Sequence, residues 1–323
     1  MGQPPIWTTR APKARRHAGA SVVTLFLAGA LLLAGAGIAS AVTVPANGAY
    51  FGAYVQSRGS QTPTQAVNSF QKLVGRKIKI VNKYHPFSDH SYRFEADMIA
   101  SGHIPMISWR ATDDAFDGHR AQKIAAGQYD ALIRNTADAM KQLGGRVLLR
   151  FAWEMDQPPG QRQYIGSSSE FISAWRRVYN IFQDRGARNV EFLWAPRAAS
   201  FSKGVGQSFY PGDNYVDWVG GSAVPLDNWN SFNSIFHGFY TWGTRQSKPI
   251  FMWVGIREKP DKASWKAGWI DDMSSTIRTS MPAVKAFVYY HALSPLGYTF
   301  WVDTSTSALR AYKQMGSRNF FNP

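Results

Sequence analysis

Eight short apolar segments recur along most of the chain, and longer segments with helical features separate them. Each is apolar on both faces and bounded by Gly, Pro or polar residues, which is typical of strands buried in a parallel sheet. This alternation of strands and helices within residues 42–323 predicts an α/β fold, a (β/α)8 TIM barrel. The eight segments are Tyr50–Val55, Lys77–Val81, Ile104–Trp109, Val147–Ala152, Val190–Ala195, Val216–Val219, Pro249–Gly255 and Ala286–His291.

Two helix starts are marked by capping residues. Thr62 followed by Pro63 supplies an N-cap and a proline in the first helical turn. Ser167 and Glu170 have the spacing of a capping box and precede a periodic apolar run. Helices are expected over Phe171–Phe182, Gln128–Lys141 and Trp265–Ile277. A doubly wound sheet is the alternative fold, but no Gly-rich phosphate loop follows the first segment.

The first 41 residues have the features of an export signal. Basic residues come first, an uncharged apolar run over Val22–Ile38 follows, and Ala39-Ser40-Ala41 matches a small-residue cleavage site. The run is also long enough for an uncleaved membrane anchor. In both cases we expect residues 42–323 to form one barrel domain outside the cytoplasm, either secreted or associated with the cell envelope.

Composition excludes several kinds of chemistry. The chain has no Cys, so it has no disulfide framework, thiol nucleophile or thiolate metal site. No Gly-x-Ser-x-Gly elbow occurs, and the histidines lack metal-ligand spacing. We therefore expect no metal and no cofactor.

The charge of the chain bears on its partners. The leader holds four of the 36 Lys and Arg residues and none of the 21 Asp and Glu residues, so the remainder carries a net charge of +11. That charge favours anionic cell-envelope polymers as partners, although it also suits general solubility. Nucleic-acid motifs are absent, and we expect a monomer.

The segment Arg146–Gln157, RVLLRFAWEMDQ, is the most informative for chemistry. In a TIM barrel the active site lies at the carboxyl ends of the strands, which is where this sequence places Arg150, Trp153 and Glu154. A carboxyl group partly desolvated beside a Trp ring has a raised pKa and suits a general acid. The alternative is a structural Glu154–Arg150 ion pair with Trp153 as a packing residue.

Aromatic and polar side chains at other strand ends are candidates for binding sugar rings. Their flat faces could stack on pyranose rings, with polar neighbours adding hydrogen bonds. Each ring taken alone also fits a packing role, and Asp213 lies in turn chemistry, Pro-Gly-Asp-Asn. The candidates are Trp109, Arg150, Trp153, Trp194, Asp213, Trp253, His291 and Trp301.

Nearly the whole of residues 42–323 resembles glycoside hydrolase family 26, the β-mannanase family. The most specific match is LLRFAWEMD at the fourth strand. The other matches, in chain order around it, are FGAYV, IPMISW, GQYDALI, EFIxAWRRVYNIF, VEFLWAP, YPGDNYVDWVG, KPIFM and VKAFVYYH.

The resemblance implies a retaining hydrolase of β-linked polysaccharide that uses two glutamates, with Glu154 as the general acid/base. The family's nucleophile follows a Lys-Pro stretch at the seventh strand, and here that position falls on Trp253 or Val254. Neither can form a glycosyl-enzyme. Trp153 and Arg197 also replace the family's His and Asn, and the usual Tyr after the sixth strand is missing.

Glu258 is the candidate for a substitute nucleophile, because a loop could return it to the mouth of the barrel. Its other interpretation is a surface pair with Arg257 or Lys259. Asp227 and Asp303 are further candidates, and a wider separation of the carboxyl groups would suit an inverting mechanism.

Three hypotheses follow from the sequence. The first is an exported glycosidase acting on mannan-type or related β-linked polysaccharide or oligosaccharide through Glu154. The second is a catalytically impaired relative that binds glycan in the ancestral cleft. The third is a structural envelope protein whose basic surface holds an anionic polymer.

Overall fold

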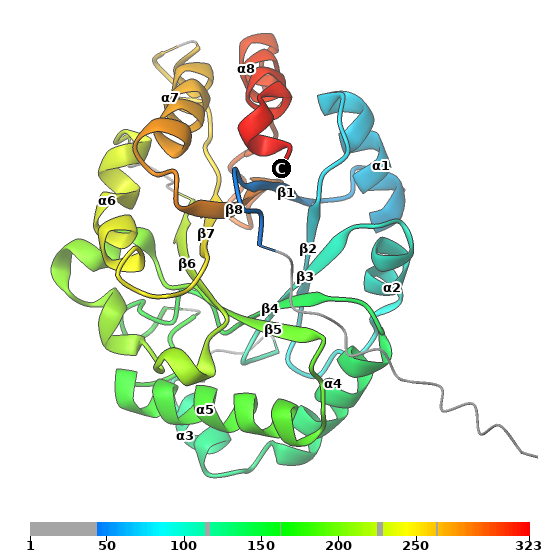
Figure 1. The fold of residues 1–323 in the computed structure, drawn as a ribbon, viewed down its shortest axis with the longest axis vertical. Helices are drawn as coiled ribbons and strands as arrows, with labels where there is room; N and C mark the ends of the chain where they lie inside the picture. The colour runs from blue at the N-terminus through cyan, green and yellow to red at the C-terminus, as the bar shows by residue number, and fades with distance from the viewer. Residues whose placement is uncertain (1–43, 114–116, 162, 225–228, 263) are drawn as a thin grey trace, which may run out of the picture. The chain divides into compact units, whose positions relative to one another are not determined.

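The computed structural model describes residues 44–113, 117–161, 163–224, 229–262 and 264–323. Eight parallel strands close into a barrel in chain order, with β8 paired to β1, so the predicted (β/α)8 fold is confirmed (Figure 1). The strands are β1 (Tyr50–Val55), β2 (Ile80–His85), β3 (Ile104–Trp109), β4 (Val147–Phe151), β5 (Val190–Trp194), β6 (Trp218–Ala223), β7 (Ile250–Val254) and β8 (Val284–His291).

Helices surround the barrel between successive strands (Figure 1). Both predicted caps are present: Thr62 and Ser167 each form a capping box with the residue three positions later. Three short 3-10 segments, Ala198–Lys203, Gly206–Phe209 and Asp213–Tyr215, connect β5 to β6. The helices are α1 (Pro63–Val74), α2 (Arg93–Ala100), α3 (Arg120–Ala125), α4 (Asp130–Gln142), α5 (Ser168–Asp184), α6 (Phe232–Gly243), α7 (Trp265–Thr279) and α8 (Thr306–Ser317).

The core has two layers because successive strand side chains point to opposite faces of the sheet. Trp218 and Trp253 belong to the cluster that fills the barrel interior. Trp109 and Trp194 belong to the larger cluster between the barrel and its helices. Strand alternation therefore decides which aromatic residues can approach the mouth of the barrel.

Strand β2 continues four residues past the predicted end at Val81. Asn82 is buried in the barrel and shares a 2.6 Å hydrogen bond with Ser108 of β3, so a polar residue here does not end the strand. Lys83 faces the other way, with its ammonium group 5.5 Å from the centroid of the Phe94 ring. Arg150 is a third buried polar residue here, and it hydrogen-bonds to the same Ser108 hydroxyl.

Two sequence predictions lie outside the described residues, namely the leader over residues 1–41 and the alternative carboxylate Asp227. Among the helices that the structure describes, none has the length and apolar character needed to cross a bilayer.

Candidate functional site

The turn that follows β4 carries Glu154 at the carboxyl end of the barrel. Ala152 and Glu154 have φ angles of +43° and +54°, in the left-handed region that side chains larger than glycine rarely adopt. A 2.9 Å hydrogen bond from the Glu154 amide to the carbonyl of Ala195 fixes this turn to the end of β5. Non-glycine residues in this region persist only when their surroundings hold them there, and they concentrate at functional sites.

Arg150, at the end of β4, is fully buried beneath this turn. Its Nε donates a 3.0 Å hydrogen bond to Ser108 Oγ, and Nη2 donates a long 3.4 Å bond to the Tyr84 hydroxyl. Among the described residues, Nη1 has no hydrogen-bond partner. Within the part of the chain that is described, no ion pair joins Arg150 directly to Glu154, so the structural ion-pair alternative is not what the geometry shows.

Aromatic rings form the floor around Arg150. Its guanidinium carbon lies 3.9 Å from the centroid of Trp253 and 5.0 Å from that of Trp153. The Tyr84 ring packs against both indoles, at centroid distances of 5.1 Å to Trp153 and 6.0 Å to Trp253. These contacts bring two predicted binding residues, Trp153 and Trp253, beside the predicted acid.

Two tyrosines continue this aromatic floor on the β1 and β8 side. Tyr54 and Tyr290 stack with their ring centroids 5.4 Å apart, and Tyr54 meets Tyr84 edge-on at 4.8 Å. Both stacked rings are partly exposed, and burial raises the pKa of Tyr290 to about 12. They remain neutral hydroxyl groups at the mouth of the barrel.

The environment of Glu154 favours its protonated form. Burial raises the pKa of its carboxyl group, and the negative charge of Asp156 raises it further. The positive charges of Arg150 and Arg197 oppose this rise, as does the 3.2 Å hydrogen bond from Gln157 Nε2 to Glu154 Oε2. Since the residue keeps some solvent exposure, its proton can reach a ligand at the mouth.

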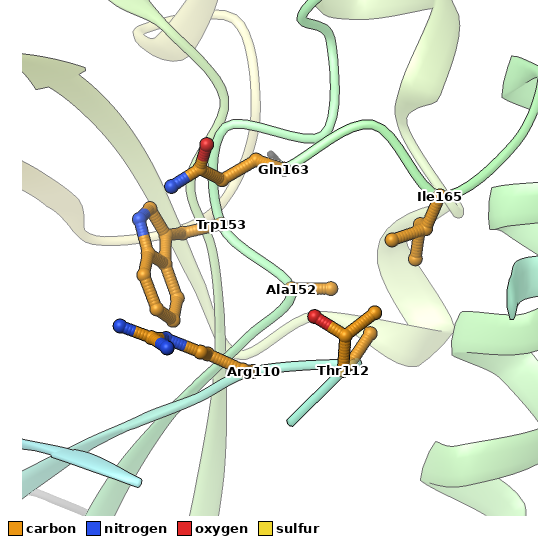
Figure 2. Close-up of a pocket in the computed structure, with 7 residues that line it drawn as sticks. Arg110, Thr112, Ala152, Trp153, Gln163 and Ile165 are labelled. Atoms are coloured by element: carbon orange, nitrogen blue, oxygen red, sulfur yellow. The ribbon is translucent and has the colours of Figure 1, made fainter. Parts of the chain in front are cut away.

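A small pocket lies beside this turn, lined by both polar and apolar groups (Figure 2). The Arg110 guanidinium and the Gln163 amide lie on two sides of the Trp153 ring. Ala152, with its left-handed backbone, forms part of the wall. The full lining is Arg110, Ala111, Thr112, Ala152, Trp153, Gln163 and Ile165.

A second polar group lies at the ends of β1 and β8. Arg58 makes a bidentate ion pair with Asp303, at 2.6 and 2.8 Å, and covers the Trp301 ring at 4.1 Å. His291 is buried beside them, and its Nδ1 accepts a hydrogen bond from the Val302 amide. Burial lowers the pKa of His291 to about 3, so its ring is neutral.

Glu258 lies near the start of α8. Its Oε1 accepts hydrogen bonds from the hydroxyls of Thr304, at 2.7 Å, and Ser305, at 2.9 Å. Lys266 is buried next to it and donates to Thr304 Oγ1 and to the Trp301 carbonyl. These contacts tie Glu258 to the loop after β8, and its role as a nucleophile stays a prediction.

Three predicted binding residues lie elsewhere. Trp109 and Trp194 are fully buried, and their indole N–H groups donate to the carbonyls of Phe87 and Phe209. Alternation turns both rings outward to the helices rather than to the mouth. Asp213 lies in the connection between β5 and β6, where its carboxylate accepts a hydrogen bond from the Tyr210 hydroxyl. The structure therefore places Trp109 and Trp194 away from the mouth, and a binding role for Asp213 stays a prediction.

Several residues that surround Glu154 are not among those predicted from the sequence. Tyr84 lies on the four-residue extension of β2, beyond the predicted end of that strand at Val81, so the prediction did not place it at the barrel. In the sequence, Arg197 stands out only as a departure from the family pattern and Asp156 only as part of the segment Arg146–Gln157, so neither is a predicted site residue. Arg197 and Asp156 form an ion pair with each other beside Glu154, with 3.4 Å between Arg197 Nε and Asp156 Oδ2. No group of three potential metal-ligating residues occurs among the described residues.

Sequence comparison finds relatives that act on polysaccharides. The chain is 30% identical to endoglucanase H of Acetivibrio thermocellus over 298 residues, covering 86% of this chain and 31% of that protein. It is 25% identical over 238 residues to a β-1,3-xylanase of an Alcaligenes species, covering 62% of this chain and 48% of the relative. The chain thus spans about a third to a half of these relatives, and no protein-family model matches it.

Structural comparison finds the same fold in family 26 β-mannanases. A GH26 β-mannanase from Bacteroides ovatus matches with a TM-score of 0.64 and 14% identity, covering 84% of this chain and 89% of the other. A β-mannanase from a symbiotic protist of the termite Reticulitermes speratus, complexed with gluco-manno-oligosaccharide, matches at 0.58 and 16% identity, covering 85% and 88%. This chain therefore has the fold of the family 26 β-mannanases and is a sequence relative of an endoglucanase and of β-1,3-xylanases.

Proposed function

We propose that this protein is a glycoside hydrolase acting on β-linked glycans, with Glu154 as the general acid/base. The observation that carries the proposal is the position of Glu154 at the carboxyl end of β4, in a strained turn, partly exposed and with a raised pKa. The relatives are named as an endoglucanase, a β-1,3-xylanase and a β-mannanase, and the last two names specify β linkages, which supports the substrate class.

In this mechanism Glu154 protonates the glycosidic oxygen as the bond to the leaving sugar breaks. A raised pKa favours the protonated form of the carboxyl group, which is the form that a general acid needs. The cations of Arg150 and Arg197 then stabilise the carboxylate that remains after proton transfer. Trp301, which is partly exposed, supplies a face against which a sugar ring can pack, and the largely buried Trp153 lines the small pocket beside the turn.

Glycoside hydrolysis also needs a second carboxyl group, as nucleophile or as general base. Glu258 is our candidate, and its Oε1 accepts hydrogen bonds from the hydroxyls of Thr304 and Ser305. A retaining mechanism needs about 5–5.5 Å between the two carboxyl groups, and an inverting mechanism about 6.5–9.5 Å with a water between them. We also propose that the protein acts outside the cytoplasm, as its leader suggests.

One observation favours a second candidate function, glycan binding without hydrolysis. Trp253 occupies one of the two positions to which the family resemblance assigns the nucleophile, and its ring packs on Arg150. An indole there cannot attack the anomeric carbon or offset its developing positive charge. The aromatic mouth would still bind a sugar chain.

The test is an assay of reducing-end release from mannan, mixed-linkage glucan and xylan, performed with wild type and Glu154→Gln. Release by wild type that is lost in Glu154→Gln supports the hydrolase. Saturable binding of one glycan with no release by either protein supports the second candidate. Adsorption that disappears with salt, and that does not depend on Trp153 or Trp301, would instead support an electrostatic envelope protein.

A further inference from the structure

The turn that carries Glu154 is fastened to the end of β5 through one buried acid. Asp156 is only 3% exposed, and its Oδ1 accepts a 3.0 Å hydrogen bond from the Arg197 amide. Its Oδ2 lies 3.4 Å from Arg197 Nε, and Arg197 Nη2 donates to the Asp156 carbonyl. Three separate contacts therefore join one arginine to the residue two positions after Glu154.

These contacts act on a backbone that needs support. The left-handed conformations at Ala152 and Glu154 are unfavourable for residues other than glycine and persist only when neighbouring contacts hold them. The hydrogen bond from Glu154 N to Ala195 O is one such contact. The Asp156–Arg197 contacts also join the turn to the segment that follows β5.

The pair also has charges of opposite sign next to the Glu154 carboxyl group. The groups facing Glu154 are Asp156 and Gln157 from its own turn, Arg150 from β4, Arg197 from the end of β5 and the Tyr84 hydroxyl from β2. Asp156 favours the protonated form of Glu154, whereas Arg197 favours the ionised form. Each partner of the pair therefore offsets the electrostatic effect of the other.

We propose that Asp156 and Arg197 are positioning residues for Glu154: together they hold the turn that presents its side chain at the mouth, and they place opposite charges next to its carboxyl group. The proposal rests on the proposed function, since it concerns the residue that donates the proton. Neither residue needs to touch the substrate. Arg197 is 37% exposed in its side chain, so it can be changed without opening the core.

The experiment follows the titration of Glu154 directly, by NMR of protein labelled with carbon-13 at the glutamate carboxyl groups. The Glu154 signal is identified by its loss in Glu154→Gln. The variants are Asp156→Asn, Arg197→Gln, the double variant and Arg197→Lys. Asp138→Asn is the control, because Asp138 of α4 also pairs with an arginine, Arg185, but on the surface and in another part of the chain. Glycan hydrolysis is measured on the same samples.

We expect Asp156→Asn to move the Glu154 midpoint to lower pH and Arg197→Gln to move it to higher pH. The double variant should fall between them, and Arg197→Lys should stay near wild type because the charge is kept. With substrate, kcat should fall at least tenfold in Arg197→Lys and in the double variant, while KM changes less. The reason is that both variants lose the contacts of the Arg197 guanidinium with Asp156.

Two results would overturn the proposal. One is a Glu154 midpoint in Asp156→Asn that matches the Asp138→Asn control or moves to higher pH. The other is an active wild type whose kcat is unchanged in Arg197→Lys and in the double variant. Because the titration needs no substrate, a wild type without hydrolysis but with the expected order of midpoints would refute the proposed function alone and leave the charge balance established.

Discussion

The guanidinium of Arg150 lies 3.9 Å from the centre of the Trp253 ring, and both side chains are buried at the inner end of the mouth. The face of Trp253 thus contacts the Arg150 cation. Among the described residues, no carboxylate forms an ion pair with Arg150. Burial lowers the pKa of Arg150, and the charges of Glu154 and Tyr84 only partly oppose that effect. The pair keeps a positive charge a short distance below Glu154.

Replacing the cation should separate stability from activity. In Arg150→Met, a buried charge is exchanged for an apolar side chain that still packs on Trp253, so the free energy of unfolding should change by less than about 2 kcal/mol. Hydrolysis should fall at least tenfold, because the ionised form of Glu154 loses its nearest buried cation. The alkaline limb of the pH–rate profile should move to higher pH, since that charge lowers the pKa of Glu154.

Chemical denaturation and a pH–rate profile of the same samples test this prediction. A limb that stays in place or moves to lower pH would show that Arg150 does not act on the proton of Glu154.

Trp253 should matter for stability above all. Trp253→Ala removes a ring that is 1% exposed and fills the barrel interior, which should cost about 3–5 kcal/mol in the free energy of unfolding. Trp253→Phe keeps part of the contact with Arg150 and should cost less. Urea unfolding of both variants measures the difference, and equal losses would mean that the contact with Arg150 contributes nothing beyond filled volume.

Trp301 should matter for glycan binding instead. Its ring is partly exposed beneath Arg58, so Trp301→Ala should weaken glycan binding roughly three- to tenfold, the range expected for one aromatic contact. Trp194→Phe is the matched control, because Trp194 is buried among the helices. It should lower stability and leave the glycan dissociation constant unchanged. Isothermal titration with an oligosaccharide distinguishes them, and equal affinities for wild type and Trp301→Ala would remove Trp301 from the binding surface.

The fold followed from the sequence because its signals are local. Apolar runs predicted β1 and β3 at their observed bounds, and capping residues predicted where α1 and α5 begin. The signals failed where tertiary packing overrides them. Strand β6 runs on through Gly220 and Gly221, past its predicted end at Val219. The Phe239 ring of α6 leaves no space for a side chain at position 221, which explains a glycine within this strand.

The site was harder to predict than the fold. Proximity to the fourth strand end was enough to select Glu154, Arg150 and Trp153. Aromatic character at a strand end was not enough, because a shift of one residue turns a ring from the mouth to the helices. Trp109 and Trp194 illustrate this limit. The position of Arg197 depends on β4 and β5 being neighbours in the closed barrel, which spacing along the chain does not encode.

Lys266 should give the folded protein a distinctive response to alkaline pH. Burial lowers its pKa from 10.5 to about 8, so between these values the unfolded chain binds more protons than the folded one. The cost of burying this charge is fully present below pH 8, and it is relieved as the pH rises to about 10.5. The gain in the free energy of unfolding should be about 3 kcal/mol.

The comparison of wild type with Lys266→Met isolates this contribution, because the variant has no proton to lose at this position. Urea unfolding at intervals across the window should show wild type gaining stability relative to the variant. A constant difference between the two proteins would mean that Lys266 keeps its ordinary proton affinity.

The central claim, that Glu154 is the proton donor of a glycosidase, is tested most directly by the rate of reducing-end release with wild type and Glu154→Gln across a pH series. The account predicts release by wild type from at least one β-linked glycan, with activity that falls on the alkaline side as Glu154 ionises. It also predicts a loss of 100-fold or more in Glu154→Gln, on the order of what a general acid contributes. Equal rates for the two proteins at every pH would contradict it.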